Sequence, residues 1–250
     1  MSDGGGHGQE IRKSFHTNLA DIREDTIRLA ASVVDVIPRG TAILLDDDLE
    51  GANLLIQADD EIDARAIDLE ERCYELLALQ QPMAGDLRRI VAAVRMIGEI
   101  ERSADLVVNI CKGARRLHGH ELDPKLRGTI TRMGEQAQFL FSRAIDSYAD
   151  ADDALAAAID DMDNLLDDLQ RELIQTIFES HSAGRIDLQV AVQLAVIARF
   201  YERIGDHAVN IGQRVRYMVT GWLPEHTGAA RYRARREAPS GSVEESAGTP

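Results

Sequence analysis

Hydrophobic residues recur along most of the chain at alternating spacings of three and four positions, which is the period of an amphipathic α-helix. The pattern is clearest near the carboxyl end, where one apolar stripe runs through Val190, Leu194, Ile197, Tyr201, Ile204, Ala208, Ile211, Val215 and Met218. A stripe of this length is typical of a long helix that packs lengthwise in a bundle. The pattern predicts an all-α protein.

Proline, glycine and aspartate residues divide the pattern into six predicted helices. Pro38 and Gly40 are expected to stop the first helix, because proline lacks an amide donor and disfavours helix in the residue before it. A continuation over residues 41–45 after a kink stays open. Aspartates are expected to cap the second, fourth and fifth helices. The predicted ranges are about 10–36, 46–79, 85–117, 123–148, 150–182 and 185–220.

The chain contains an internal repeat. Residues 101–110 match residues 202–211 at a constant offset, with Glu, Arg, Asp, Val, Asn and Ile identical. The preceding helices match at a slightly larger offset, and a loop between the helices can absorb the difference. The positions that correspond there are Asp59, Ile62, Asp63, Leu69 and Cys73 with Asp163, Leu166, Asp167, Leu173 and Ile177.

The repeat predicts two tandem, sequence-related three-helix bundles, built from six long antiparallel helices. Their expected bounds are residues 10–120 and 121–221. Short loops between long helices favour antiparallel neighbours. Residues 222–250 lose the apolar period and become rich in Arg, then in Pro, Ser, Gly and Glu, so we expect a flexible tail there.

The composition excludes some function classes. The net charge is -15, so a nucleic acid would meet mostly repulsion and is not an expected partner. Cys73 and Cys111 lie within apolar runs without a CxxC partner, and each is expected to behave as a small hydrophobe. Residues 1–9 are polar and glycine-rich without the apolar segment of a signal sequence, and no apolar run is long enough for a membrane span. We expect a cytoplasmic protein that meets a membrane only through its partners.

Each half of the chain carries two acidic pairs, one on each of two consecutive predicted helices. The two members of a pair are four positions apart, which places both carboxylates on one helical face. If the two helices pack side by side, four carboxylates converge on one outer patch in each half, and the pair on the last helix should lie on the surface. The eight candidate residues are Asp59, Asp63, Glu101 and Asp105, and Asp163, Asp167, Glu202 and Asp206.

Carboxylates held together repel one another, and a hard cation or raised pKa values relieve the repulsion. Ligation by oxygen alone favours Mg, Mn, Ca or ferric Fe over Zn or Cu. The plainer alternative is a set of solvated helix faces that keep the protein soluble. His207 has no histidine counterpart, since Leu106 stands at the matching position, and it is expected to be a surface residue and no ligand.

The chain offers no pattern for catalysis. Carboxylate clusters in bundles can hold di-iron centres, but these use a Glu-x-x-His motif that is absent at the repeated sites. A phosphate loop, a dinucleotide fingerprint and a supported Ser-His-Asp order are also missing. We expect a non-enzymatic adaptor, and the alternative is a metal-binding bundle with a metalloenzyme or metal-storage role.

Four segments together resemble the PhoU family, over about residues 19–221. They are Leu79-Gln-Gln-Pro82-Met-Ala-Gly-Asp86-Leu-Arg-Arg-Ile90, Glu101-Arg-x-x-Asp105, Glu202-Arg-Ile-Gly-Asp206-His-x-x-Asn210-Ile211 and Tyr217-Met-Val-Thr-Gly221. The resemblance implies a pair of three-helix bundles whose first helix is usually uninterrupted. Ser103 and Ala104 depart from the Ile-Gly at 204 and 205, which puts the equivalence of the two acidic sites in question.

The resemblance also implies a function. PhoU proteins link the phosphate ABC transporter to a two-component sensor kinase, and they restrain phosphate uptake and starvation signalling when phosphate is plentiful. Expected partners are therefore the transporter ATPase subunit, the sensor histidine kinase and a second copy of the chain. Metal ions or iron clusters on the acidic motifs are implied in the same way. Because the sequence shows no phosphate-binding cradle, we expect phosphate to be sensed indirectly, through the transporter.

Overall fold

The structure, a computed structural model, describes residues 4–80 and 82–222, with side chains from residue 12 onward. The described part contains six helices and no strand, which confirms the predicted all-α class. The helices are α1 (Gly4–Asp46), α2 (Leu49–Gln80), α3 (Gly85–Leu117), α4 (Pro124–Asp150), α5 (Asp153–Ser182) and α6 (Leu188–Thr220). The tail predicted for 222–250 lies, after Trp222, outside the described residues.

The prediction that Pro38 and Gly40 stop the first helix is wrong. α1 continues through both residues to Asp46. Proline has no N–H to donate to the carbonyl four positions earlier, which here belongs to Val34. The side-chain amide of Gln138, on α4, donates to this Val34 oxygen at 3.4 Å, so a neighbouring helix supplies the missing donor. A side chain 104 positions after Val34 therefore satisfies the carbonyl that Pro38 leaves without a donor, which helps the helix to continue across Pro38.

Aspartates cap the helices as expected. The side chain of Asp123 accepts from the backbone N–H groups of Lys125 and Leu126, and Asp152 caps α5 in the same way. Asp48, the last of three consecutive aspartates at positions 46–48, accepts from the N–H of Gly51 at 2.8 Å. Asp187 caps α6, a role that the sequence pattern did not single out. Each cap satisfies amide donors that the first turn of a helix leaves unpaired.

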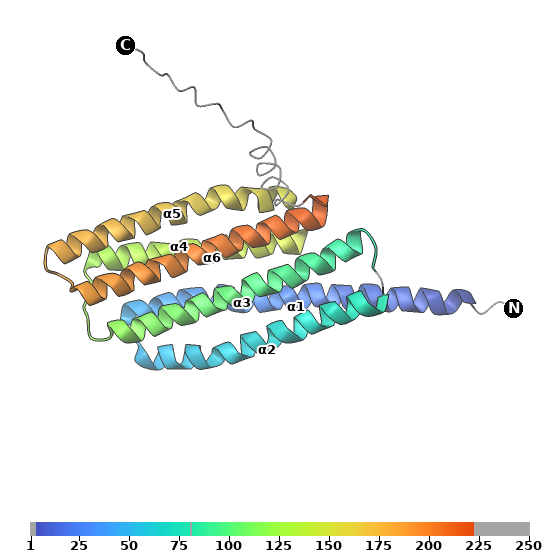
Figure 1. Cartoon of the computed structure of the whole chain (residues 1–250), viewed down its shortest axis with the longest axis horizontal. Helices are drawn as coiled ribbons and strands as arrows, with labels where there is room; N and C mark the ends of the chain where they lie inside the picture. Colours follow the sequence, from blue (N-terminus) through green and yellow to red (C-terminus); the bar gives the residue numbers. More distant parts are fainter. Residues whose placement is uncertain (1–3, 81, 223–250) are drawn as a thin grey trace, which may run out of the picture.

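The helices form two layers (Figure 1). α2, α3, α6 and α5 lie side by side in one layer, and α1 and α4 pack together behind α3 and α6. α3 and α6 are antiparallel, because Glu99 on α3 meets His207 on α6 while Arg116 meets Gln193. Each layer thus draws on both halves of the chain, and the two central helices place the repeated motifs near one another.

One hydrophobic core runs through both three-helix units. Tyr201 of α6 is fully buried, and its hydroxyl lies 2.8 Å from the hydroxyl of Thr41 on α1. Gly134 allows α4 to reach the same threonine, since a Cβ there would lie 2.4 Å from the Thr41 hydroxyl oxygen. The predicted α6 stripe is buried except for Met218, which is half-buried. Cys73 and Cys111 are buried free thiols, which confirms their prediction as small hydrophobes.

None of the six helices combines the length and hydropathy that crossing a membrane requires, within the part of the chain that the structure describes.

Candidate functional site

The structure brings the four acidic residues of the first half together. Asp59 and Asp63 on α2 face Glu101 and Asp105 on α3, and we call these four residues the first acidic cluster. Burial raises the pKa of Asp59 to about 6, with further contributions from the charges of Asp63, Asp105 and Glu101. The pKa values of Asp63 and Glu101 are raised for the same two reasons, burial first and neighbouring carboxylates second.

The second half repeats this arrangement on α5 and α6. We call Asp163, Asp167, Glu202 and Asp206 the second acidic cluster. Burial raises the pKa of Asp163 to about 7, and the charges of Asp167, Asp206 and Glu202 raise it further. The pKa of Glu202 is also raised, mainly by burial and then by Asp206. The convergence that the spacing predicted is therefore present in both halves.

The two clusters differ in detail. An oxygen of Asp163 approaches Gly205 so closely that a Cβ at Gly205 would lie 2.2 Å from it. The matching position in the first half is Ala104, whose side chain denies Asp59 this approach. The charge of Lys112 also acts on Asp59 and opposes the increase of its pKa, whereas Gln213 stands at the matching position of the second half. Both differences agree with the higher pKa of Asp163.

The exposure of the α6 pair is only partly as predicted. Asp206 is exposed, but the side chain of Glu202 is 12 % exposed and pairs with Arg199. One oxygen of Glu202 is inaccessible and has no hydrogen-bond partner in the described structure, and the same holds for one oxygen of Asp63 in the first cluster. α5 packs against α6, and the charge of Asp167 on α5 acts on Glu202, so this side of α6 is closer to its neighbour than the sequence pattern predicted.

The donor set of both clusters consists of carboxylate oxygens, which suits hard cations. Within residues 4–80 and 82–222, however, no three or more histidine, cysteine, aspartate or glutamate side chains are arranged so that they could hold a metal ion. As placed, the clusters are electrostatically coupled but do not form a coordination shell. Binding of Mg, Mn or Fe at these residues stays a prediction.

The prediction of a surface position for His207 is wrong. His207 is 7 % exposed, and its Nδ1 lies 2.5 Å from an oxygen of Glu99 on α3. Asn210 donates to the same Glu99 oxygen at 3.2 Å. Burial alone would raise the pKa of Glu99, but these hydrogen bonds and the neighbouring positive charges hold it below its ordinary value. The Glu99–His207–Asn210 group is thus a polar contact between the two three-helix units.

A signal for this pair was present in the sequence. Comparison of the repeats places Phe200 at the position of Glu99 and Leu106 at the position of His207. One side of the α3–α6 contact therefore has a charged and polar pair where the related side has two apolar residues. A paired exchange of this kind indicates that the two positions touch.

Comparison with known proteins gives a consistent result. A family model described as the PhoU domain matches the chain twice, over residues 19–114 and 130–215. The phosphate-specific transport system accessory protein PhoU homolog 1 of Mycobacterium leprae is 33% identical over 216 residues, which cover 86% of this chain and 96% of that protein. The corresponding PhoU homolog 2 of Mycobacterium bovis is 34% identical over 215 residues, covering 86% and 100%.

Two crystal structures share the fold. PhoU from Pseudomonas aeruginosa superposes with a TM-score of 0.78 at 26% identity, covering 83% of this chain and 100% of that one. The phosphate transport system regulatory protein PhoU from Streptococcus pneumoniae gives 0.77 at 23% identity, covering 84% and 98%. The arrangement of six helices in two related units is therefore shared with solved structures.

Proposed function

The chain belongs to the PhoU family, and on that basis we propose that it is a non-enzymatic accessory protein that regulates phosphate transport. The observation that carries this proposal is the family match over both three-helix units. Relatives that are 33% and 34% identical and aligned almost end to end are named as accessory proteins of the phosphate-specific transport system. An accessory protein acts by contact, so its surface is where the function must be sought.

We further propose that the chain acts in the cytoplasm as an adaptor between the ATPase subunit of the phosphate ABC transporter and a sensor histidine kinase. In this role it restrains phosphate-starvation signalling when phosphate is plentiful. The two acidic clusters support the proposal, because they lie on neighbouring helices of one layer and carry repelling carboxylates that a basic partner surface would relieve. The homodimer that the family implies stays a prediction.

The alternative function, a metalloenzyme or metal-storage bundle, would need a set of ligands that converges on an ion. The described residues hold no such set. Since no other observation favours the alternative, the adaptor role is the function that the chain supports best.

A pull-down from phosphate-replete cells tests the adaptor role. The tagged chain is compared with a variant in which Glu101→Gln, Asp105→Asn, Glu202→Gln and Asp206→Asn are combined. These changes remove four charges and preserve side-chain shape. We expect the intact chain to recover the transporter ATPase or the sensor kinase. The variant should lose it, because charge complementarity between the clusters and a basic partner surface sets the rate and specificity of association.

A control variant carries the same change of net charge at exposed acidic residues on α1, α4 and the loop before α4. The control changes are Asp21→Asn, Asp35→Asn, Glu121→Gln and Glu135→Gln. We expect the control to recover partners as the intact chain does. If the intact chain, verified as folded, recovers neither the ATPase nor a kinase, the adaptor role is contradicted. Equal loss in both variants would assign the effect to net charge and contradict a role for the clusters.

A further inference from the structure

A cavity lies at the junction of the two three-helix units. It is lined by α1 and α3 of the first unit and by the α4–α5 turn and α6 of the second. Its volume is about 330 Å³, which lies near the lower end of the range for small-molecule pockets in proteins, ~300–1,000 Å³. If each non-hydrogen atom takes the ~30 Å³ of a water molecule, a cavity of this volume holds roughly ten non-hydrogen atoms.

The charge of the lining differs from that of the molecule as a whole. The chain has 43 acidic and 28 basic residues, yet neither Asp nor Glu lines this cavity, whereas two arginines do. Arg23 donates a hydrogen bond to the carbonyl oxygen of Ala149 at the end of α4. A carbonyl oxygen fixes the side chain without cancelling its charge. Arg89 pairs with Asp86 at 3.1 Å and keeps a side chain that is 58 % exposed. Arginine has five N–H donors, so Arg23 and Arg89 can each donate hydrogen bonds to an anion in addition to these partners.

The inner wall of the cavity is apolar. Leu19, Ile22, Ala93 and Tyr148 line it, and each is exposed by less than a tenth of its surface. Burial raises the pKa of Tyr148 to about 12, so its phenol is neutral at physiological pH. The cavity thus combines an apolar interior with basic side chains at its mouth, which is the division of surfaces that an amphiphile with an anionic head requires.

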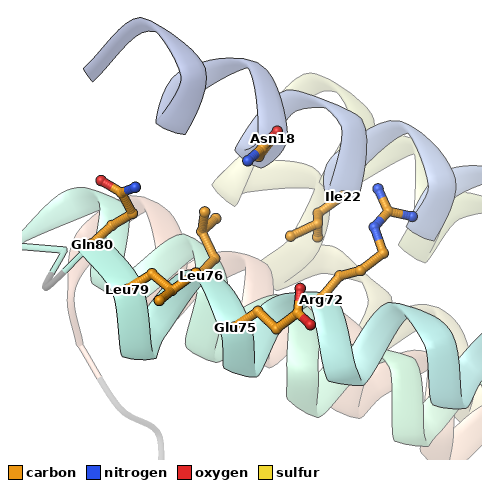
Figure 2. Close-up of a pocket in the computed structure, with 7 residues that line it drawn as sticks. All are labelled: Asn18, Ile22, Arg72, Glu75, Leu76, Leu79 and Gln80. Atoms are coloured by element: carbon orange, nitrogen blue, oxygen red, sulfur yellow. The ribbon is translucent and has the colours of Figure 1, made fainter. Parts of the chain in front are cut away.

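A second cavity, which Ile22 also lines, provides a contrast (Figure 2). It lies between α1 and α2, has a volume of about 200 Å³, and is lined by both apolar and polar residues, among them Leu76, Glu75 and Arg72. Arg72 already pairs with Asp25 at 2.8 Å. The carboxylate of Glu75 in the lining makes this second cavity less suitable for an anion than the cavity between the units, whose lining holds no Asp or Glu. The basic, apolar combination therefore belongs to the cavity between the units.

We propose that the cavity between the two units binds a small single-chain amphiphile with an anionic head group. Its alkyl chain lies against Leu19, Ile22 and Tyr148, and its head group receives hydrogen bonds from Arg23 and Arg89. The head group is a carboxylate or a phosphate ester, both of which accept bonds from guanidinium groups in the same way. The proposal is independent of the regulatory function proposed above. Because both units line the cavity, the bound ligand would hold them together and stabilise the fold.

Calorimetric titration of the full chain with octanoate, which has ten non-hydrogen atoms, tests the site. We expect one saturable site, and we expect 1-octanol and octylammonium to bind at least about tenfold more weakly, because they lack the charge-assisted hydrogen bonds. Octyl phosphate serves as the second anionic probe. Whichever anion binds more tightly identifies the head-group class, and either order supports the site.

Two variants locate the binding. Arg23→Gln combined with Arg89→Gln should weaken octanoate about tenfold and leave 1-octanol unchanged, because only the head group loses contacts. Ala20→Leu should abolish binding of both, since Ala20 is an exposed lining residue whose enlargement fills the cavity without disturbing the core. Arg115→Gln and Ala157→Leu make the same chemical changes at exposed positions outside the lining and should have no effect.

Three results would overturn the proposal. The first is the absence of saturable octanoate binding up to about 1 mM. The second is equal affinity for octanoate, 1-octanol and octylammonium, which would leave the arginines without a role. The third is octanoate binding that survives Ala20→Leu. All five changed residues are exposed, so unfolding should not intervene, and a thermal melt of each variant verifies this.

Discussion

Asp163 is the residue at which the cost of burying a carboxylate within an acidic cluster should be measurable as stability. Burial and the charges of Asp167, Asp206 and Glu202 raise its pKa from 3.8 to about 7. A pKa raised in the folded state means that the folded chain holds the proton more tightly than the unfolded chain. Stability then falls as the pH rises from about 4 to about 7, and the full cost is present above that range. Asp163→Asn removes the charge and keeps the shape, so the variant should avoid this cost.

The magnitude follows from the shift. Three pKa units at ~1.36 kcal/mol each would give ~4 kcal/mol as an upper limit. Asp163 is only half-buried, and solvent screening reduces the interaction to about 1–2 kcal/mol. We therefore expect Asp163→Asn to raise the free energy of unfolding by about 1–2 kcal/mol at pH 8 and to leave it nearly unchanged at pH 4. Asp59→Asn should show a smaller gain that is lost nearer pH 6, because the pKa of Asp59 is raised only to about 6.

Urea unfolding followed by far-UV circular dichroism at pH 4, 5, 6, 7 and 8 measures these differences. Asp161→Asn is the matched control, because Asp161 is an exposed aspartate on the same helix. The control should change the free energy of unfolding by less than about 0.5 kcal/mol at every pH. A difference between Asp163→Asn and the wild type that is independent of pH, or a variant less stable than the wild type at pH 8, would refute the account of the cluster.

Three further substitutions test other contacts. His207→Leu should cost about 2–4 kcal/mol in urea unfolding, because it leaves the carboxylate of Glu99 with only the hydrogen bond from Asn210. Glu99→Phe added to it copies the Phe200–Leu106 pair and should recover most of the loss, whereas additive losses would contradict this. Gln138→Ala should cost about 1 kcal/mol of stability by removing the donor to the Val34 carbonyl. In a Pro38→Ala background this cost should vanish, because the new backbone N–H donates to the same carbonyl. An equal cost in both backgrounds would contradict the explanation of the uninterrupted helix. Gly205→Ala should destabilise the chain by about 1–3 kcal/mol in thermal or urea unfolding, because its methyl group meets Asp163; an unchanged stability would show that α5 and α6 are not packed as described.

The sequence allowed the helices and the convergence of the acidic residues to be predicted, because both depend on local spacing and on the internal repeat. The features that it could not supply depend on contacts between helices. The course of α1 through Pro38 requires a donor from α4. The exposure of Glu202 depends on which flanks of α6 are covered, and α6 contacts α3, α4 and α5. For His207, the paired exchange with Phe200 and Leu106 is a signal in the sequence, but only the contact between α3 and α6 shows that the residue is buried. An apolar stripe shows where the core of one helix lies, but it does not show how far its neighbours extend around it.

The difference between the two acidic clusters could be predicted from the sequence only in part. The exchange of Gly205 for Ala104 is visible in the aligned repeats, and it indicates unequal packing beside the clusters. Only the structure shows its consequence, which is that an oxygen of Asp163 lies where a Cβ at Gly205 would stand. The role of Lys112 beside Asp59 is a contact between α2 and α3 that no spacing within one helix predicts.

The most direct test of the central claim, regulation of phosphate transport through the acidic clusters, is the rate of phosphate uptake in phosphate-replete cells that lack this chain. We predict that uptake rises in its absence, that the intact chain and the control variant restore restraint, and that the variant with Glu101→Gln, Asp105→Asn, Glu202→Gln and Asp206→Asn does not. Uptake that is unchanged by removal of the chain would contradict the regulatory role. Full restoration by the cluster variant would contradict the part assigned to the acidic clusters.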